Sequence, residues 1–572
     1  MTAALSGRWR DAAIAMAVAA LLTLAWTIAD WARLSALILP DPDDMMRLMQ
    51  IRDWIGGQAF SDLSQYQLGG GLAMHWSRLP DLVPAALIVL LEPLAGRHGA
   101  ELVAVILWPA VLFAATLALL ASLARRLSGG AGAGLIALLL GALAYPATGF
   151  FTPGRIDHHG LQLLLLLAGG RAMLAAPSAR AGAVAGVAIA ASIAIGLESA
   201  PLCALVLAAI ALRWVVEGKD RAAMLAATGM GLSGGMALAA LLLAPRIWPS
   251  ALCDAFTPPV AWMAILAGVL LAMVGVVPGL DTRVRRVGAL ALAGAMLIAA
   301  VPFLAPACLA GPYGAVPPLL RTLWLDHVAE AQPLFGTPVA VVIGYAGLML
   351  AGLAAVVVQV ARNRSDAGLL SWLALLLGAV VLSGIQLRLA PFGAALAVPV
   401  LAAMIVRVRA RGRPLATVAA WAGSAGILYP LAAGALPVSR PAEQPRAPCL
   451  TPANLQRIAV LGPGMIAVPL DMGAYVLETP GQAVLAAPYH RNGAANLAHY
   501  RLFLGKPETA AAEAQWWKLR AIAYCPGWVD DLDLAGVAAP GSIVALARQG
   551  RTPGWTKPVA GPDGVIILVP RP

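Results

Sequence analysis

The chain has 572 residues, of which 60% are hydrophobic and only 12% charged, and its formal net charge is +11. Because an ordinary soluble domain carries about 25% charged residues, so little charge excludes a soluble enzyme of this size. The basic residues stand in short clusters between apolar runs, which is typical of a topology signal in a membrane protein and argues against a nucleic-acid partner.

The apolar runs predict an α-helical polytopic membrane protein with about thirteen transmembrane helices, since about 20 residues cross a bilayer. The first run is too long for the core of a cleavable signal peptide, so we interpret it as a signal anchor. A further run at 82–95 is interrupted by Glu92 and Pro93, so it is predicted to lie along the interface or to re-enter. The expected spans are 12–38, 101–124, 133–150, 160–176, 181–197, 199–215, 223–244, 260–279, 287–310, 337–361, 367–385, 390–407 and 415–436.

The basic connectors predict the orientation of these spans. Arginine clusters such as Arg125-Arg126 alternate along the chain with acidic, proline-rich loops, and basic loops face the cytoplasm. We therefore expect a multi-pass protein of the bacterial cytoplasmic (inner) membrane whose polar loops face the periplasmic, exported side. The transmembrane domain is predicted over 1–437, and the exported loops are 40–100, 151–159, 245–259 and 311–336.

The composition changes after residue 437. A proline-rich linker, with Pro441, Pro445 and Pro448, leads into short apolar runs that alternate with polar residues. Strand-like runs interleaved with helix predict an extracytoplasmic mixed α/β domain over 438–572. The strand-like runs are Met465–Pro469, Tyr475–Leu477, Ala483–Ala487, Ala521–Tyr524, Ser542–Ala547 and Val565–Val569. The run Thr509–Lys518 is expected to be a helix, with Trp516 and Trp517 packed in the domain core.

The five cysteines have no metal-ligand spacing, so zinc or redox chemistry based on cysteine is not expected. Cys203 lies in an apolar run. The other four lie in or beside exported segments, which leaves free thiols and the disulfides Cys253–Cys308 and Cys449–Cys525 both open.

The first exported loop opens on three carboxylates within four residues, Asp41, Asp43 and Asp44, shortly before Arg47. Adjacent carboxylates repel one another. A divalent cation with oxygen ligands relieves the repulsion, and so does an acidic turn in which Asp43 or Asp44 caps the next helix. The same loop ends in an aromatic and cationic patch, His75-Trp76-Ser77-Arg78, suited to lipid headgroups or to an anionic ligand.

A second polar group, Arg155 with Asp157-His158-His159, lies between two apolar spans. Asp157 and His159 are spaced to reach one cation from a turn, and a carboxylate with an imidazole suits Mn²⁺ better than Ca²⁺. Two interfacial histidines beside an Asp–Arg pair are the structural alternative. Glu198, at another exported helix end, is either part of this site or a helix-terminal polar residue.

Two more charged residues stand out in apolar surroundings. Glu330 lies in an acidic part of the long loop before the tenth span, and Arg388 lies at the exported end of a pair of apolar helices. An ionisable residue in such a place is a functional candidate. Snorkelling of Arg388 to lipid phosphates is the alternative.

Taken in order, these segments resemble the catalytic subunit of oligosaccharyltransferase, a polytopic glycosyltransferase of the GT-C class. Asp41-Pro42 followed by Arg47 is similar to the start of the family's first exported loop, and Asp157-His158-His159 stands where the family has Asp-x-Asp or Asp-x-Glu. Val328 to Pro333 matches four of the six positions of the family's Val-Ser-Glu-His-Gln-Pro. His75-Trp76-Ser77-Arg78 and Leu387-Arg388-Leu389 echo two further motifs.

The resemblance implies transfer of a sugar or oligosaccharide from a polyprenyl-(pyro)phosphate donor to an acceptor protein, lipid or glycan on the exported face. It also implies that four side chains converge on one divalent metal, Mn²⁺ or Mg²⁺. The implied metal ligands are Asp41, Asp157, His159 and Glu330, the implied catalytic residues are Asp41, Asp157 and Glu330, and the implied phosphate-binding residues are Arg388 and Arg78. Further candidates are Asp43, Asp44, Arg47, Arg155, His158 and Asp471.

The sequence departs from the family in the C-terminal domain. Where the family has Trp-Trp-Asp-Tyr-Gly, this chain has Pro469-Leu470-Asp471-Met472-Gly473, so transfer to asparagine does not follow from the resemblance. A single-sugar transferase with a polyprenyl-monophosphate donor is the alternative within the enzyme class. Outside it, a lipid or glycan transporter (flippase) would place ionisable residues at the midplane of broken helices, and a noncatalytic glycan-binding role needs no metal.

Overall fold

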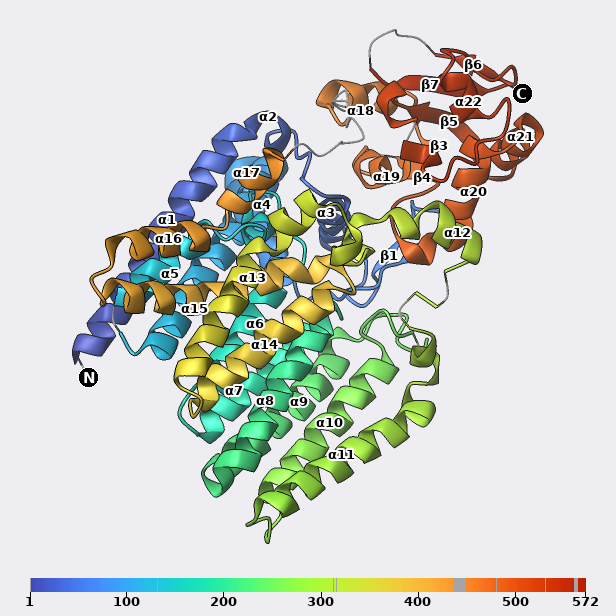
Figure 1. The fold of residues 1–572 in the computed structure, drawn as a ribbon. Helices are drawn as coiled ribbons and strands as arrows, with labels where there is room; N and C mark the ends of the chain where they lie inside the picture. Colours follow the sequence, from blue (N-terminus) through green and yellow to red (C-terminus); the bar gives the residue numbers. More distant parts are fainter. Residues whose placement is uncertain are drawn as a thin grey trace.

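A computed structural model of the chain describes residues 2–571, apart from 131, 251, 312, 315, 437–448, 480, 530 and 560–563. Apolar helices form one large bundle, and a smaller domain with a β-sheet lies at one end of it, beside α3 and α12 (Figure 1). The structure therefore confirms a helical membrane protein with a C-terminal α/β domain. The proline-rich linker expected around Pro441 to Pro448 lies outside the described residues.

Each expected span overlaps an apolar helix or, for the last span, a bent pair of helices, but the helices in the expected spans 12–38 and 133–150 end earlier, at Ala29 and Ala142. Among the described residues, seven helical stretches are long and apolar enough to cross a membrane, or eight if the pair bent by 77° counts as one span. The helices are α1 (Thr2–Ala29), α4 (Leu82–Ser128), α5 (Gly132–Ala142), α6 (His159–Met173), α7 (Ala179–Ile195), α8 (Ala200–Glu217), α9 (Ala222–Leu243), α10 (Pro258–Val276), α11 (Arg283–Leu304), α13 (Val339–Arg362), α14 (Ala367–Ser383), α15 (Ala390–Arg409), α16 (Pro414–Ser424) and α17 (Leu428–Gly434).

The short run at 82–95 is the first part of α4, which bends at Gly96. The backbone there has φ 68° and ψ 168°, a left-handed conformation that glycine adopts without a steric penalty. Arg97 just beyond the bend pairs with Glu92 at 3.1 Å. The sequence had suggested that Glu92 and Pro93 interrupt this run. In the structure the helix continues through both residues and bends at Gly96 instead.

A short helix α2 (Trp31–Leu34) precedes the first loop, which folds into the helix α3 (Pro42–Ile55) and a hairpin of β1 (Ser64–Gln65) and β2 (Leu72–Ala73). The side chain of Asp41 accepts the Asp43 N–H at 3.0 Å and Pro42 takes the first helical position, two features that start a helix. The N-cap is therefore Asp41, and neither Asp43 nor Asp44 has the expected capping role.

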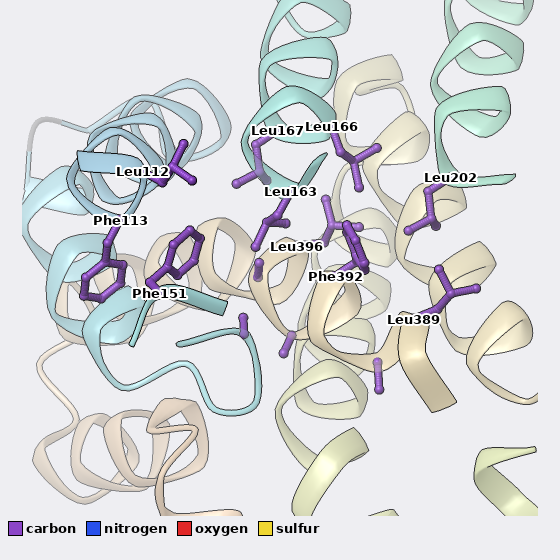
Figure 2. Close-up of a cluster of buried hydrophobic side chains, with 14 of the residues drawn as sticks. Leu112, Phe113, Phe151, Leu163, Leu166, Leu167, Leu202, Leu389, Phe392 and Leu396 are labelled. Atoms are coloured by element: carbon purple, nitrogen blue, oxygen red, sulfur yellow. The ribbon is translucent and has the colours of Figure 1, made fainter. Parts of the chain in front are cut away.

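Buried rings fix the loop that precedes α6. Phe151, in the 3-10 turn Ala147–Phe151, stacks on Phe113 with ring centroids 5.2 Å apart, and Phe150 packs edge-on against Phe392 at 5.6 Å. Leucines from α4, α6 and α15 close around these rings (Figure 2). The loop that carries Asp157 therefore rests on a packed core shared by three helices.

The long loop between α11 and α13 is built from α12 (Pro318–Leu323) and short 3-10 turns, one of which, Ala329–Ala331, holds Glu330. The N–H of Leu387 donates to the carbonyl oxygen of Gln332 at 2.8 Å. This bond joins the long loop to the turn that carries Arg388.

The C-terminal domain has a five-stranded mixed sheet in the order β4-β3-β5-β7-β6. The strand β3 is parallel to β4 and β5, and β7 is antiparallel to β5 and β6. The strands are β3 (Gly464–Ala467), β4 (Gln482–Val484), β5 (Leu519–Tyr524), β6 (Thr556–Pro558) and β7 (Ile566–Pro570), and the helices are α18 (Pro452–Ala459), α19 (Leu470–Val476), α20 (Gly493–Leu504), α21 (Pro507–Trp516) and α22 (Ile543–Ala547).

Three details of this domain differ from the prediction. Tyr475–Leu477 and Ser542–Ala547 belong to the short helices α19 and α22, because the periodicity of so short an apolar run fits both helix and strand. The predicted helix Thr509–Lys518 is confirmed as α21. Trp516 at its end is 80% exposed, so it is not the core residue that we expected.

Both cysteine pairs are disulfide-bonded in the structure, and Cys203 is free and buried. Cys253–Cys308 spans 55 residues between two loops, and Cys449–Cys525 closes a loop of 76 residues within the C-terminal domain.

Replacing both Cys449 and Cys525 with serine should destabilise the C-terminal domain by about 2–5 kcal/mol, because the bond restricts the unfolded chain. The midpoint of thermal unfolding of the purified protein in detergent, followed by fluorescence, is expected to fall. Cys203→Ala serves as the control, since Cys203 forms no disulfide. An unchanged midpoint in the double variant would contradict a stabilising bond.

Candidate active site

Two adjoining cavities lie where the first loop, the Asp157 loop, the long loop and the C-terminal domain meet. The larger has a volume of about 700 Å³ and the smaller about 160 Å³. The charged and imidazole side chains that line both cavities are Asp43, His159, Glu330 and Arg388. The structure thus brings together four segments that are far apart in the sequence.

Arg155 holds the acidic start of α3 against the Asp157 loop. Its guanidinium lies 3.1 Å from Asp41 Oδ2, 3.2 Å from Asp44 Oδ2 and 2.8 Å from Asp157 Oδ2. Asp44 is fully buried, and its Oδ1 accepts the backbone N–H of Asp157 at 2.9 Å. Arg155 and Asp44 therefore fasten one polar segment to the other, and Asp44 does not line either cavity.

Asp43 and Asp41 differ in what surrounds their carboxylates. Desolvation raises the pKa of Asp43 well above its ordinary value, and the nearby charges of Asp41, Glu330 and Asp157 raise it further. Asp41, with a side chain 42% exposed, uses Oδ1 to cap α3 and Oδ2 to pair with Arg155. Asp43 lines both cavities, whereas Asp41 lines only the larger one.

Asp157 and His159 form a close buried pair. The backbone N–H of His159 donates to Asp157 Oδ1 at 2.8 Å, and the ring Nδ1 lies 2.9 Å from Oδ2. Burial alone would raise the pKa of Asp157, but the charges of His159 and Arg155 hold it well below its ordinary value. The ring of His159 stacks on Phe150 at 5.2 Å, which fixes its plane.

These residues fit a divalent cation. Asp157, His158 and His159 are buried and their candidate ligand atoms lie within 4.8 Å of one another, but both ring nitrogens of His158 face other groups, Arg47 and Glu198. Asp43 adds a carboxylate whose neighbours are largely other carboxylates, and a cation would relieve that repulsion. A donor set of carboxylates with imidazole suits Mn²⁺ or a similar ion.

Arg388 is positioned for an anion. Its Nη2 lies 3.3 Å from Glu330 Oε1 and donates to the hydroxyl of Tyr313 at 2.7 Å. Its Nε is buried and has no hydrogen-bond partner among the residues that the structure describes. Glu330 is 56% exposed and holds Arg388 only from one side, so part of the guanidinium remains available to a ligand in the cavity.

Arg47 belongs to a buried chain of polar groups behind the site. It donates to Asp81 Oδ1 at 2.9 Å and contacts His158 Nδ1 at 3.3 Å. Because arginine only donates, Nδ1 of His158 accepts and Nε2 carries the proton, 3.3 Å from Glu198 Oε1. Arg47 therefore orients His158 and Glu198, and it has no contact with either cavity.

Arg78 is also a structural residue, contrary to the expectation that it binds donor phosphate. It is 1% exposed and donates to the backbone carbonyls of Gln50 and Asp62, at 2.8 Å each. It lines neither cavity. Its guanidinium is used by backbone carbonyls and presents no surface to a phosphate in either cavity.

Replacing Arg47 with methionine should destabilise the protein by about 3–5 kcal/mol, because it removes the closer of the two arginines that pair with the buried carboxylate of Asp81 and leaves only Arg78, at 3.6 Å. The expected result is a lower midpoint of thermal unfolding in detergent. Lys219→Met removes an exposed ion pair with Asp281 and should leave the midpoint unchanged. An Arg47 variant with the wild-type midpoint of thermal unfolding but no activity would instead indicate that Arg47 binds the ligand.

The smaller cavity is completed by His75, from the predicted aromatic and cationic patch, and by three residues that we did not predict: Asp254, Tyr313 and His490. Asp254 Oδ2 lies 2.5 Å from His490 Nε2, and Arg491 pairs with the same carboxylate at 2.6 Å. The signal in the sequence was the run of polar residues from His490 to Asn492, which falls where the resembled family has an asparagine-rich segment. Asp471, at the start of α19, lines the larger cavity.

No protein-family model matches the sequence, and no curated protein matches it. The fold is similar to crystal structures of the oligosaccharyltransferase of Archaeoglobus fulgidus. The apo form has a TM-score of 0.71 at 13% identity and covers 99% of this chain and 74% of that chain. The complex with zinc and sulfate has a TM-score of 0.67 at 13% identity, and the match covers 97% of this chain and 73% of that chain.

A third structure, the archaeal enzyme AglB of Archaeoglobus fulgidus in complex with an inhibitory peptide and a dolichol-phosphate, has a TM-score of 0.66 at 13% identity. It covers 90% of this chain and 69% of that chain. The chain therefore has the GT-C fold of the oligosaccharyltransferases along nearly its whole length, and it is a multi-pass membrane protein.

Proposed function

We propose that this protein is a membrane glycosyltransferase that moves a sugar or oligosaccharide from a polyprenyl-(pyro)phosphate donor to an acceptor. The observation that carries the proposal is the convergence of Asp43, His159, Glu330 and Arg388 on one cavity in a protein of GT-C fold. A lipid-linked sugar places its tail among apolar helices and its phosphate at their ends, where these charged side chains lie.

Arg388 binds the donor phosphate in this proposal. A guanidinium presents a planar fork of donors that matches phosphate oxygens. The buried Nε of Arg388 lacks a partner among the described residues, and a phosphate in the cavity would supply one. The dolichol-phosphate bound to the related archaeal enzyme supports a lipid phosphate as the ligand.

The metal ligands proposed here are Asp43, Asp157, His159 and Glu330, with Asp41 as the residue that the family resemblance favours in place of Asp43. A Mn²⁺ or Mg²⁺ ion bound there would neutralise the charge that develops on the leaving phosphate. Asp43 and Glu330 both line the smaller cavity, and in this proposal one of these carboxylates also orients the acceptor nucleophile. Arg155 keeps Asp157 in place by its 2.8 Å ion pair.

The position of the charged groups favours an enzyme over a flippase. If the protein were a flippase, its ionisable residues would be expected near the middle of broken transmembrane helices. Here Asp43 and Asp157 lie in loop segments or at helix ends, and Arg388 lies in a 3-10 turn just before α15. We propose that this end of the bundle faces the periplasm of a bacterial inner membrane, and that the chain divides into domains at 437.

The proposal is tested in the source organism by comparing glycoconjugates of a deletion strain and its complemented parent by mass spectrometry. A species that disappears on deletion and returns with the wild-type gene identifies the product and the acceptor class. An identical set of glycoconjugates in both strains would overturn the proposed transfer.

Arg388→Gln should lower the rate of formation of that product about 10–100-fold, because hydrogen bonds to a charged group contribute about 1.5–3 kcal/mol. The rate is measured in membranes that contain their own donor and acceptor. Arg364→Ala, a change in an exposed loop at the other end of α14, is the control and should leave the rate unchanged. An Arg388→Gln variant with the wild-type rate would exclude Arg388 from donor binding.

A further inference from the structure

The smaller cavity contains a histidine and an aspartate in an arrangement suited to proton transfer. His490 Nε2 lies 2.5 Å from Asp254 Oδ2. Because the carboxylate only accepts, Nε2 carries the proton, and the free lone pair of the ring is on Nδ1. Nδ1 of His490 has no hydrogen-bond partner among the residues that the structure describes. Hydrogen bonds from Arg491 keep Asp254 in place, at 2.6 Å to each carboxylate oxygen.

Asp254 is held in its ionised form. Burial alone would raise the pKa of its carboxyl, but the hydrogen bonds from Arg491 and His490 lower the pKa below its ordinary value. The Cys253–Cys308 disulfide fixes the loop next to Asp254. An ionised carboxylate in a fixed loop orients the imidazole that donates to it.

The pair opens on the same cavity as the proposed donor-binding residues. The ring of His490 packs 5.1 Å from the ring of His75 and 5.5 Å from that of Tyr313. Tyr313 in turn accepts a hydrogen bond from Arg388 at 2.7 Å, and Arg388 contacts Glu330 at 3.3 Å. A continuous line of contacts thus joins His490 to the side chain that would hold the donor phosphate.

The geometry points to the smaller cavity as the subsite for the acceptor, a sugar hydroxyl, with His490 as the general base that Asp254 orients. This inference rests on the proposed function and deepens it by naming the acceptor class. The cavity has a volume of about 160 Å³, which admits a small polar group. Several of its lining side chains can form hydrogen bonds, as a sugar ring with several hydroxyl groups requires.

The step balances without a further reactant. The acceptor oxygen forms a bond to the anomeric carbon of the donor sugar, and the bond from that carbon to the phosphate oxygen breaks, with its electron pair leaving on the phosphate. The hydroxyl proton passes to His490 Nδ1 and then from the imidazolium to water or to the departing phosphate.

A purely structural role for the pair predicts a different result. His490 and Arg491 also fasten the C-terminal domain to the loop of Asp254, and Arg491 contacts the carbonyl oxygens of Ala73 and Met74 at 3.4 Å. A glutamine at position 490 still donates to Asp254 but accepts no proton at neutral pH. His490→Gln therefore preserves the contact and removes the base.

The test uses full-length variants in membranes of the deletion strain, which contain their own donor and acceptor. We expect His490→Gln to lower the rate of product formation about 10²–10⁴-fold, the range for loss of a general base. His490→Gly is expected to recover activity when imidazole is added, and the exposed His98→Ala should keep the wild-type rate. Linkage analysis of the product should show an acetal between two sugars.

A wild-type rate in His490→Gln, or a His490→Gly variant that folds but does not respond to imidazole, would overturn the role of His490. An amide-linked product, or one released from serine or threonine by mild alkali, would overturn the sugar hydroxyl as acceptor. In all these cases the wild-type protein still forms the product, whereas failure of the proposed function is the absence of any product that depends on the gene.

Discussion

Replacing Glu330 with glutamine is expected to lower the rate of sugar transfer by about 10²–10³, the loss typical of removing one electrostatic group from a reacting centre. Glu330 lines both cavities and is paired only with Arg388 among the described residues, at 3.3 Å. Glutamine keeps the size of the side chain but removes the negative charge that would bind a metal or orient the acceptor.

The effect on folding should be small, because the side chain of Glu330 is 56% exposed and lies in a surface turn. The same variant should therefore unfold at the wild-type temperature while its turnover falls. Asp326→Asn is a matched control, since Asp326 lies in the same loop, is exposed and lines neither cavity. Near-normal turnover of Glu330→Gln in membranes with a competent donor would remove Glu330 from the reaction.

The membrane helices could be predicted because their signal is local. A run of apolar residues of bilayer length forms a helix whatever its neighbours are. The short runs of the C-terminal domain carry no such signal, so Ser542–Ala547 was expected as a strand and is a helix. The bend in α4 depends on one positive φ at Gly96, which a hydropathy pattern does not register.

The candidate site could be predicted only as separate segments. Arg78 and Arg388 both stand beside apolar or aromatic residues in segments that the sequence predicts to be exported, and the sequence does not distinguish them. The structure does, because Arg78 is buried against backbone carbonyls, whereas Arg388 lines both cavities. Asp254 and His490 are 236 residues apart, and only the docking of the C-terminal domain brings them to 2.5 Å.

The acidic turn gives a second prediction with a large effect, because neighbouring carboxylates have different contacts in the structure. Asp43→Asn should lower the transfer rate by about 10²–10³, as expected for a group at the reacting centre. Asp41→Asn should have a smaller effect. Asp41 mainly caps α3 and pairs with Arg155, and an asparagine still caps a helix well.

The comparison of Asp43→Asn with Asp41→Asn distinguishes the two roles, because the substitutions are chemically identical and only two residues apart. If Asp43 is a metal ligand, its asparagine variant should also need a higher Mn²⁺ concentration for half-maximal transfer, while the Asp41 variant keeps the wild-type requirement. The opposite order, with the larger loss in Asp41→Asn, would show that the family resemblance identifies the ligand correctly. In that case the carboxylate of Asp41 must leave Arg155, 3.1 Å away in this structure, before it can bind the cation.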